Sequence, residues 1–461
     1  MKRLLFIALS AAAFSCSGPT DGLTDEERSV VHSLWLHTTP ADPSNRFFHD
    51  GDAGFLGQML FFDPRISGPL ALSQNTQTSK LGDGVSMAPG QLSCADCHSP
   101  DHYFSDDRST PNNVSFGSAG WTTRNSPALV NVGFYSAPPG KQWFAWDGRS
   151  DSLWMQCAVA YEAGKAMGGD RLRLARVLAS TDAYRERVRG MDPVAGALLD
   201  DPTLFPDDGG TSGCYQNADG GFGPCADQLQ RVVAVTSKAW AAYLAQLRSL
   251  DSPFDTFAAG DPEALDQQQL RGLKLFLGQA GCITCHSGPF FTDRQFHNTG
   301  LVQGHGITGV PDIDNGRSDA FALLRASPYN LLGAWSDLDP GGIRSQLVDT
   351  GYPGGPAPEN VGQFRTKSLR SVAQTAPFMH AGQLDTLKDV VEFYNAGGNP
   401  SGVNGTKDIL MQPLGLSPDD IDDLVAFLGS LTGKPVDSML SCDPSPRFAG
   451  GAPHRFKACP P

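Results

Sequence analysis

A pentapeptide of the form Cys-x-x-Cys-His occurs twice in the chain, as Cys94-Ala-Asp-Cys97-His98 and as Cys282-Ile-Thr-Cys285-His286. Covalent attachment of a c-type haem requires this pattern. Each thiol bonds one vinyl group of the porphyrin, and the histidine binds iron as the proximal ligand. The alternative for one copy alone is a redox pair or half of a zinc site, but neither copy has a second Cys-x-x-Cys nearby. The recurrence therefore predicts two haems.

Composition and charge narrow the class of protein further. The 461 residues leave room for two or three domains. The 52 glycines and 34 prolines, with 40% hydrophobic residues, indicate a globular chain with many loops. A net charge of −14 argues against nucleic acid or an anionic membrane surface as partner, and it permits a basic redox protein.

The N-terminus has the form of an export signal over residues 1–16. Lys2-Arg3 precedes a short apolar run that ends at Phe14 and is too short to stay in a bilayer. Ala13-Phe14-Ser15-Cys16 resembles a bacterial lipobox, in which Cys16 would carry a lipid anchor. The alternative is an ordinary secretory signal with a spare cysteine. Both readings place the mature chain outside the cytoplasm, in the periplasm.

Five of the ten cysteines are needed neither for haem nor for lipid. Two pairs bracket short loops, and in an oxidising compartment we expect the disulfides Cys214–Cys225 and Cys442–Cys459. Cys157 would remain as a lone buried thiol.

Hydrophobic periodicity predicts a mainly α fold with long loops. Helices are expected at residues 26–36, 56–65, 152–162, 170–189, 228–249, 261–276, 384–395 and 418–431. Residues 99–150, 190–226 and 290–364 read as loops. The order helix, Cys-x-x-Cys-His, loop occurs twice, which indicates a weak repeat of a cytochrome c-like unit. The expected domains are a tether (17–45), an N-terminal unit (46–255), a C-terminal unit (256–433) and a Pro-rich tail (434–461).

Several further segments make residues 56–431 resemble the bacterial dihaem cytochrome c peroxidases, including their MauG-type branch. The segments are Leu-Phe-Phe-Asp-Pro-Arg, Arg-Asn-Ser-Pro, Trp-Asp-Gly-Arg, Ser-Leu-Arg-Ser-Val, Ala-Pro-Phe-Met-His and Glu-Phe-Tyr-Asn, in that order. The resemblance implies two cytochrome c-like haem domains packed face to face. The N-terminal domain would be peroxidatic, and the C-terminal domain would transfer electrons.

The resemblance also implies a reaction. Hydrogen peroxide would react at the N-terminal haem, whose proximal ligand is His98, and electrons would come from the C-terminal haem, ligated by His286. Trp146 matches a family tryptophan between the haems and would relay the electrons; core packing is the alternative role for it. A small redox protein, a cytochrome c or a cupredoxin, would donate electrons. In the MauG branch a protein substrate is oxidised instead.

Tyr394 is the residue that favours the MauG branch. Conventional peroxidases place a methionine at this position, fourteen residues after the histidine matching His380. A tyrosine ligand there favours higher oxidation states of the second iron. The alternative is a packed tyrosine, with Met379 or another methionine as the ligand.

The family also binds a calcium ion between its domains. By resemblance its ligands would be the Asn125 side chain and the backbone carbonyls of Thr375 and Pro377. Such hard oxygen ligands suit calcium.

The pocket above the first haem departs from the family pattern. A blocking histidine is expected about sixteen residues after the first motif, but Ser118 lies near that place, and His102 reads as a surface residue. The first iron should therefore be open. Gln156 matches the family's distal glutamine, whereas Ala166 stands where the proton-shuttling glutamate is expected. Glu162 is the nearest substitute. Without such a shuttle, the alternative function is an electron carrier or haem sensor with little turnover.

Overall fold

The computed structural model describes residues 21–35, 41–70, 88–106, 115–135, 142–201, 204–205, 225–302, 313–349, 351–444 and 456–460. The expected signal, Cys16 and Cys214 lie outside these residues. Within the described ranges, no helix has both the length and the apolar character needed to cross a membrane.

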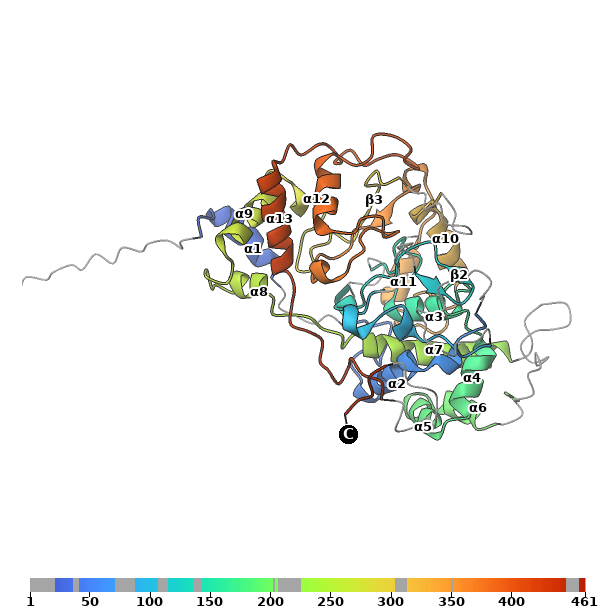
Figure 1. Ribbon diagram of the computed structural model, residues 1–461. Helices are drawn as coiled ribbons and strands as arrows, with labels where there is room; N and C mark the ends of the chain where they lie inside the picture. Colours follow the sequence, from blue (N-terminus) through green and yellow to red (C-terminus); the bar gives the residue numbers. More distant parts are fainter. Residues whose placement is uncertain are drawn as a thin grey trace, which may run out of the picture.

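The fold is mainly helical (Figure 1). In chain order the helices are α1 (Asp25–Ser33), α2 (Gly51–Phe62), α3 (Leu153–Glu162), α4 (Arg171–Ala179), α5 (Asp182–Met191), α6 (Pro193–Leu199), α7 (Ala226–Leu244), α8 (Pro253–Ala258), α9 (Gln267–Leu277), α10 (Arg317–Ala326), α11 (Ile343–Asp349), α12 (Leu387–Asn395) and α13 (Pro418–Ser430). Two antiparallel strand pairs are very short: β1 (Phe116–Gly117) with β2 (Gly120–Trp121), and β3 (Phe296–His297) with β4 (Phe364–Arg365).

Two helix pairs, α2 with α7 and α9 with α13, form the centres of two hydrophobic cores. In each pair a glycine allows close approach of the backbones. A Cβ on Gly57 of α2 would lie 2.2 Å from the Ala239 carbonyl oxygen, and one on Gly272 of α9 would lie 2.0 Å from that of Asp423. Neither glycine can be replaced without separating its helices, because buried backbone atoms cannot yield as a flexible side chain does.

The two ends of the described chain each pack on the opposite unit. Leu23, Val31 and Leu34, in and beside α1, are buried in the core of the C-terminal unit. The C-terminal segment lies near α2 and α7 of the N-terminal unit (Figure 1). There the Tyr243 hydroxyl donates to the Leu440 carbonyl at 2.6 Å. The amphipathic segment expected at residues 26–36 therefore packs its apolar face on the C-terminal unit.

The expected helices are present, with several corrected boundaries. The single helix expected over 170–189 is two helices, because Ser180 ends α4 and Thr181 begins α5. The helix expected from residue 261 begins at Gln267, where the Asp266 side chain accepts a hydrogen bond from the Gln269 amide. A carboxylate at this position caps a helix and fixes its start.

Three helices lie in stretches that the sequence indicated as loops, namely α6, α10 and α11. The start of α6 had a recognisable signal. Asp192 caps the helix through the Ala195 amide, and Pro193 occupies its first turn. The loop prediction for these three stretches was wrong because each helix is short, with ten residues at most.

One expected disulfide is confirmed. Cys442 and Cys459 are joined, and Cys442 is 2% exposed. Cys225 is also disulfide-bonded, while Cys214, its expected partner, is not among the described residues. Cys157 is a free, partly buried thiol, as predicted.

Candidate dihaem site

The two Cys-x-x-Cys-His motifs have the same local structure. Each begins with a single 3-10 turn, Cys94–Asp96 in the first motif and Cys282–Thr284 in the second. In both, the histidine amide donates to the carbonyl of the first cysteine, at 3.0 Å for His98 and 2.9 Å for His286. This tight turn brings the histidine back beside the two thiols, as attachment to one porphyrin requires.

Both motif histidines are oriented by a backbone carbonyl. Nδ1 of His98 lies 3.1 Å from the Phe104 oxygen, and Nδ1 of His286 lies 2.9 Å from the Phe291 oxygen. A hydrogen bond at Nδ1 fixes the tautomer and leaves Nε2 to bind a metal. Burial lowers the pKa of His286, which favours the neutral ring that a metal ligand must be.

A single cavity of about 870 Å³ is lined by residues of both motifs. Phe61, Leu153 and Trp240, from α2, α3 and α7, form part of its wall in the N-terminal unit. Predicted site residues also line it, and these are Cys94, His98, Asn125, Trp146, Gln156, Cys282, Cys285, His286, Thr375, Pro377 and Tyr394. Cys97 and Glu162 are the predicted site residues that do not.

Trp146 is positioned by contacts with Asn125, Lys367 and His380. Its indole N–H donates to the Asn125 carbonyl at 2.8 Å. The Lys367 ammonium nitrogen lies 4.3 Å from the centre of its ring, and the His380 ring meets it edge-on. Burial lowers the pKa of Lys367 well below its usual value.

The turn that carries Trp146 is held by arginines of the C-terminal unit. Arg365 donates to the carbonyls of Ala145 and Trp146, at 3.3 and 2.8 Å. Arg317 donates to the carbonyls of Asp147 and Gly148, at 3.3 and 2.7 Å. Four consecutive carbonyls of one unit are thus bound by the other, so the position of Trp146 depends on the contact between the two units.

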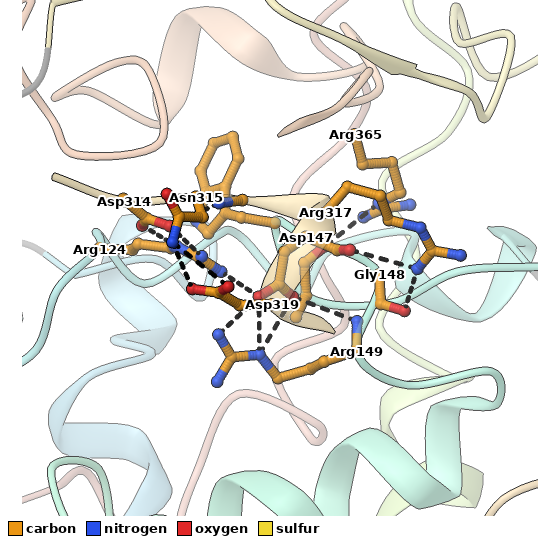
Figure 2. A network of polar contacts seen from close by, with 12 residues as sticks. Arg124, Asp147, Gly148, Arg149, Asp314, Asn315, Arg317, Asp319 and Arg365 are labelled. Carbon is orange, nitrogen blue, oxygen red and sulfur yellow. Dashed lines mark hydrogen bonds and ion pairs between the residues drawn. The ribbon is translucent and has the colours of Figure 1, made fainter. Parts of the chain in front are cut away.

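Asp147, the residue after Trp146, joins a buried ion network (Figure 2). Its carboxylate pairs with Arg124 at 2.7 Å and with Arg149 at 2.6 Å, and Arg124 also pairs with Asp314 of the other unit at 2.6 Å. Burial raises the pKa of Asp147, but the two guanidinium groups lower it more, and the result is a pKa well below the usual range. The charge therefore persists without water because it is paired.

The pocket near the first motif contains Gln156 but not Glu162. The Gln156 Oε1 accepts from the Ser150 hydroxyl at 2.9 Å, which leaves the amide N–H2 as the donor end of that side chain. Glu162 pairs instead with Arg171, at 2.5 and 3.0 Å. Ala166 does line the cavity. The proposal of Glu162 as a substitute shuttle is not supported by this placement.

Tyr394 lies on α12 on the cavity wall of the C-terminal unit. Burial raises its pKa above the usual range, and the nearby Cys282 and Cys285 add to the effect. A phenol in such a site becomes a phenolate only with a strong cationic partner, such as a ferric ion, to offset desolvation. Met379 and Met411 also line the cavity, so the methionine alternative has two candidates.

Two of the three residues expected around calcium meet directly. The Asn125 Nδ2 lies 2.9 Å from the Pro377 carbonyl, and the Asn125 amide donates to the His380 carbonyl at 2.9 Å. Asn125 Oδ1 is buried and has no hydrogen-bond partner among the described residues. Thr375 donates its hydroxyl to the Val372 carbonyl and lies on the cavity wall.

His102 and Ser118, the two residues considered after the first haem motif, both contact backbone carbonyls. His102, expected on the surface, is partly exposed, and its Nε2 lies 2.9 Å from the Ala376 carbonyl, next to Pro377. Ser118 is buried and donates to the Pro69 carbonyl at 2.6 Å. It is absent from the cavity wall formed by the described residues.

The residues present fit two c-type haems. The fit rests on the pair of equivalent turns, on the two histidines that a backbone carbonyl orients at Nδ1, and on the mostly aromatic and aliphatic cavity that both motifs share. Sequence reasoning missed Arg317 and Asp314, because no motif marks them and their role depends on contacts across the units.

Comparison with known proteins places the chain in a family. A family profile described as di-haem cytochrome c peroxidase matches residues 53–263. A cytochrome-c peroxidase, IdrP2, of Denitromonas iodatirespirans is 31% identical over 386 residues, covering 83% of this chain and 82% of the relative. The methylamine utilization protein MauG of Methylorubrum extorquens is 29% identical and covers 92% of both chains. The chain therefore belongs to the di-haem cytochrome c peroxidase family.

Solved structures support the same fold. The diheme peroxidase BthA from Burkholderia thailandensis superposes with a TM-score of 0.58 at 23% identity, over 87% of this chain and 90% of that one. A MauG-like protein associated with microbial copper homeostasis superposes with a TM-score of 0.57 at 24% identity, over 89% of this chain and 98% of that one.

Membership of the family defines the class of this chain. It is a peroxidase-like di-haem oxidoreductase with c-type haems, a peroxide substrate and redox partners.

Proposed function

We propose that this enzyme reduces hydrogen peroxide at the N-terminal haem, with electrons relayed from the C-terminal haem through Trp146. Cys94, Cys97 and His98 would hold the first haem, and Cys282, Cys285 and His286 the second. The observation that carries the proposal is the single cavity that contains residues of both motifs and Trp146. When bound, the haems supply the iron at which peroxide is reduced and the store of electrons for it.

The chain's own residues orient the reactants in this proposal. Gln156, fixed by Ser150, presents amide N–H groups that can donate to a bound peroxide. The indole of Trp146 is an oxidisable side chain on the cavity wall that both motifs share, and its N–H donates to the Asn125 carbonyl. Because that carbonyl cannot accept a proton, oxidation of the indole leaves its proton in place.

Turnover tests the proposed function. The purified protein with two haems should oxidise a reduced small redox protein, a cytochrome c or cupredoxin, only when peroxide is added. A basic donor should react faster than an acidic one, because the enzyme carries a net charge of −14. Peroxide-independent oxidation, or none at all, would contradict the proposal. A protein substrate, as in the MauG branch, is the variant to test if donor proteins are not oxidised.

A second function is favoured by one observation. At the first motif the cavity contains Ala166, and Glu162 is held by Arg171, so the described residues supply no carboxylate for proton transfer there. An electron carrier or haem sensor with little turnover would need none.

Ala166→Glu tests whether the pocket binds peroxide, as a peroxidase requires and an electron carrier or haem sensor does not. A glutamate at this cavity position should speed peroxide cleavage by about 10²-fold or more, which is the range for a positioned general acid–base group. Ala166→Gln is the matched control, with equal size and no titrating proton, and its rate should stay that of the wild type. The rate constant of the first spectral change after mixing with peroxide is the measurement. Equal rates for both variants would mean that position 166 does not face bound peroxide.

Tyr394 is proposed as the sixth ligand of the second iron. Tyr394→Met should raise the reduction potential of the second haem, because thioether ligation favours the reduced iron. Tyr394→Phe removes only the oxygen and should convert the low-spin spectrum of that haem to high spin. Spectroelectrochemistry and electron paramagnetic resonance give both readouts. A wild-type spectrum in Tyr394→Phe would assign the ligand to another residue, such as Met379 or Met411.

Calcium is proposed between the units, bound by the Asn125 side chain and the carbonyls of Thr375 and Pro377. The support is Asn125 Oδ1, which is buried without a described hydrogen-bond partner, while Nδ2 of the same amide donates to the Pro377 carbonyl at 2.9 Å. Removing the ion with a chelator should lower the thermal midpoint, and added calcium should restore it. Asn125→Ala should start at the lower midpoint and respond to neither. A wild-type midpoint unchanged by the chelator would contradict the site.

We further propose that the mature chain lies in the periplasm, anchored by a lipid on Cys16. The basis is the signal-like sequence of residues 1–16. Mass spectrometry of the N-terminal peptide from membranes would detect the lipid. A mature chain that begins at another residue and lacks the lipid would contradict the anchor but not the export signal.

A further inference from the structure

Beside the second haem motif, the imidazole of His297 is held between two carboxylates. Its Nδ1 lies 2.7 Å from Asp408 Oδ2, and its Nε2 lies 2.8 Å from Asp293 Oδ2. The three side chains are about four-fifths buried, with exposures of 21% for His297, 20% for Asp408 and 18% for Asp293. We refer to these three residues as the His297 triad.

Hydrogen-bond accounting gives the triad a net charge of −1. A carboxylate can only accept, so an imidazole that faces a carboxylate at each nitrogen carries both protons and is cationic. The hydrogen bond with Asp293 raises the pKa of His297, and the contacts with Cys285 and Asp408 raise it further. Burial raises the pKa values of Asp293 and Asp408, but their hydrogen bonds with His297 help to hold both below the usual value. The ammonium group of the neighbouring Lys407 donates to the Gly397 carbonyl at 2.8 Å.

The triad lies against the point where the second haem would be attached. The side chains of three residues come together here. One polar side-chain atom from each of Cys285, Asp293 and His297 lies within 4.8 Å of the other two. The Asp293 amide also donates to the Cys285 carbonyl at 2.7 Å, which fixes the carboxylate to the motif backbone. His297 and Asp408 line the same cavity as Cys285 and His286.

A metal ion is the other reading of Cys285, Asp293 and His297 together. Attachment of haem would convert the Cys285 thiol to a thioether, which removes the strongest of the three ligands. Both imidazole nitrogens already face carboxylate oxygens, so no lone pair of His297 points at a metal. The arrangement is that of a fixed charge.

We propose that the His297 triad lowers the reduction potential of the second haem and thereby stabilises the oxidised state that the relay needs. The inference rests on the proposed attachment of that haem at Cys285. A net negative charge beside Cys285, in a partly buried site, would favour the more positive oxidation state of an iron held by that motif. The triad therefore acts on the haem through its field, and its members are not ligands.

Two substitutions of opposite charge test the triad. Asp408→Asn takes away a negative charge and should raise the potential of the second haem. His297→Gln takes away the positive charge, leaves both carboxylates, and should lower it. Asp422→Asn is the matched control, since this carboxylate of the same unit is half exposed and pairs with Lys388 at the surface. In Asp422→Asn the reduction potential of the second haem should equal that of the wild type.

Potentials of both haems are read by spectroelectrochemistry on the intact two-haem protein. Shifts of opposite sign in Asp408→Asn and His297→Gln support the proposal, because a merely disordered site would move both variants the same way. Shifts of the same sign, or no shift, overturn it. Haem content by mass tests the underlying attachment separately. A wild-type chain with fewer than two haems overturns the proposed function, whereas two haems with unshifted potentials overturn only the triad.

Discussion

Trp146→Phe should slow electron transfer between the two haem centres by about 100-fold or more, corresponding to about 2.7 kcal/mol in activation free energy. The benzene ring fills most of the same space but is much harder to oxidise than indole. It also loses the N–H that the Asn125 carbonyl accepts. The rate is measured after a laser pulse reduces one haem of the half-reduced protein, and donor turnover should fall with it.

Trp143→Phe is the control for this change. Trp143 lies three residues earlier, stacks on Tyr352 and is absent from the described cavity wall. Its substitution should leave the interhaem rate near that of the wild type. If Trp146→Phe transfers electrons as fast as Trp143→Phe, Trp146 is a packing residue and the relay follows another path.

Asp147→Asn should lower the free energy of unfolding by roughly 3–5 kcal/mol, the usual cost of removing one partner from a buried ion pair. The amide keeps the shape of the side chain but leaves Arg149, and one side of Arg124, without a counter-charge. The network also joins the two units through Asp314. If unfolding occurs in more than one step, the midpoint of the first step should therefore shift most. Circular dichroism during denaturant unfolding of the two-haem protein measures this loss.

The acid dependence of Asp147 has a definite sign. Its pKa is depressed in the folded state, so its contribution to stability is present above the unfolded value of about 3.9 and is lost as the pH falls below it. The wild type should therefore lose its advantage over Asp147→Asn only in strong acid. Asp200→Asn is the control, because its pair with Arg189 is nearly half exposed and worth about 1 kcal/mol or less. Equal losses in the two variants would refute the network's role.

Local features of the site were predictable from the sequence. The haem motifs are five-residue patterns that can be recognised without knowledge of the fold, and the two copies have the same local turn. The helices with clear caps or long apolar faces, such as α7 and α13, were also predictable. Gln156 and Tyr394 lie on helices whose register the motifs fixed, and both line the cavity.

Features that depend on contacts between distant segments were not predictable. Glu162 has a suitable position in sequence, but Arg171 binds its carboxylate outside the cavity wall. Arg317 and Arg365 donate hydrogen bonds to backbone carbonyls of the Trp146 turn, which lies about 170 to 220 positions earlier in the chain. Such pairings carry no local signal, because only the folded chain brings the two partners together.

The most direct test of the central claim is the reaction of the fully oxidised protein with one equivalent of hydrogen peroxide. Rapid freeze-quenching and Mössbauer spectroscopy distinguish the two irons. If the two motifs share one reaction through Trp146, each haem centre should lose one electron, and Trp146→Phe should confine the change to the first centre or delay it at the second. A change at one haem only in the wild type, or no change at either, would contradict the account.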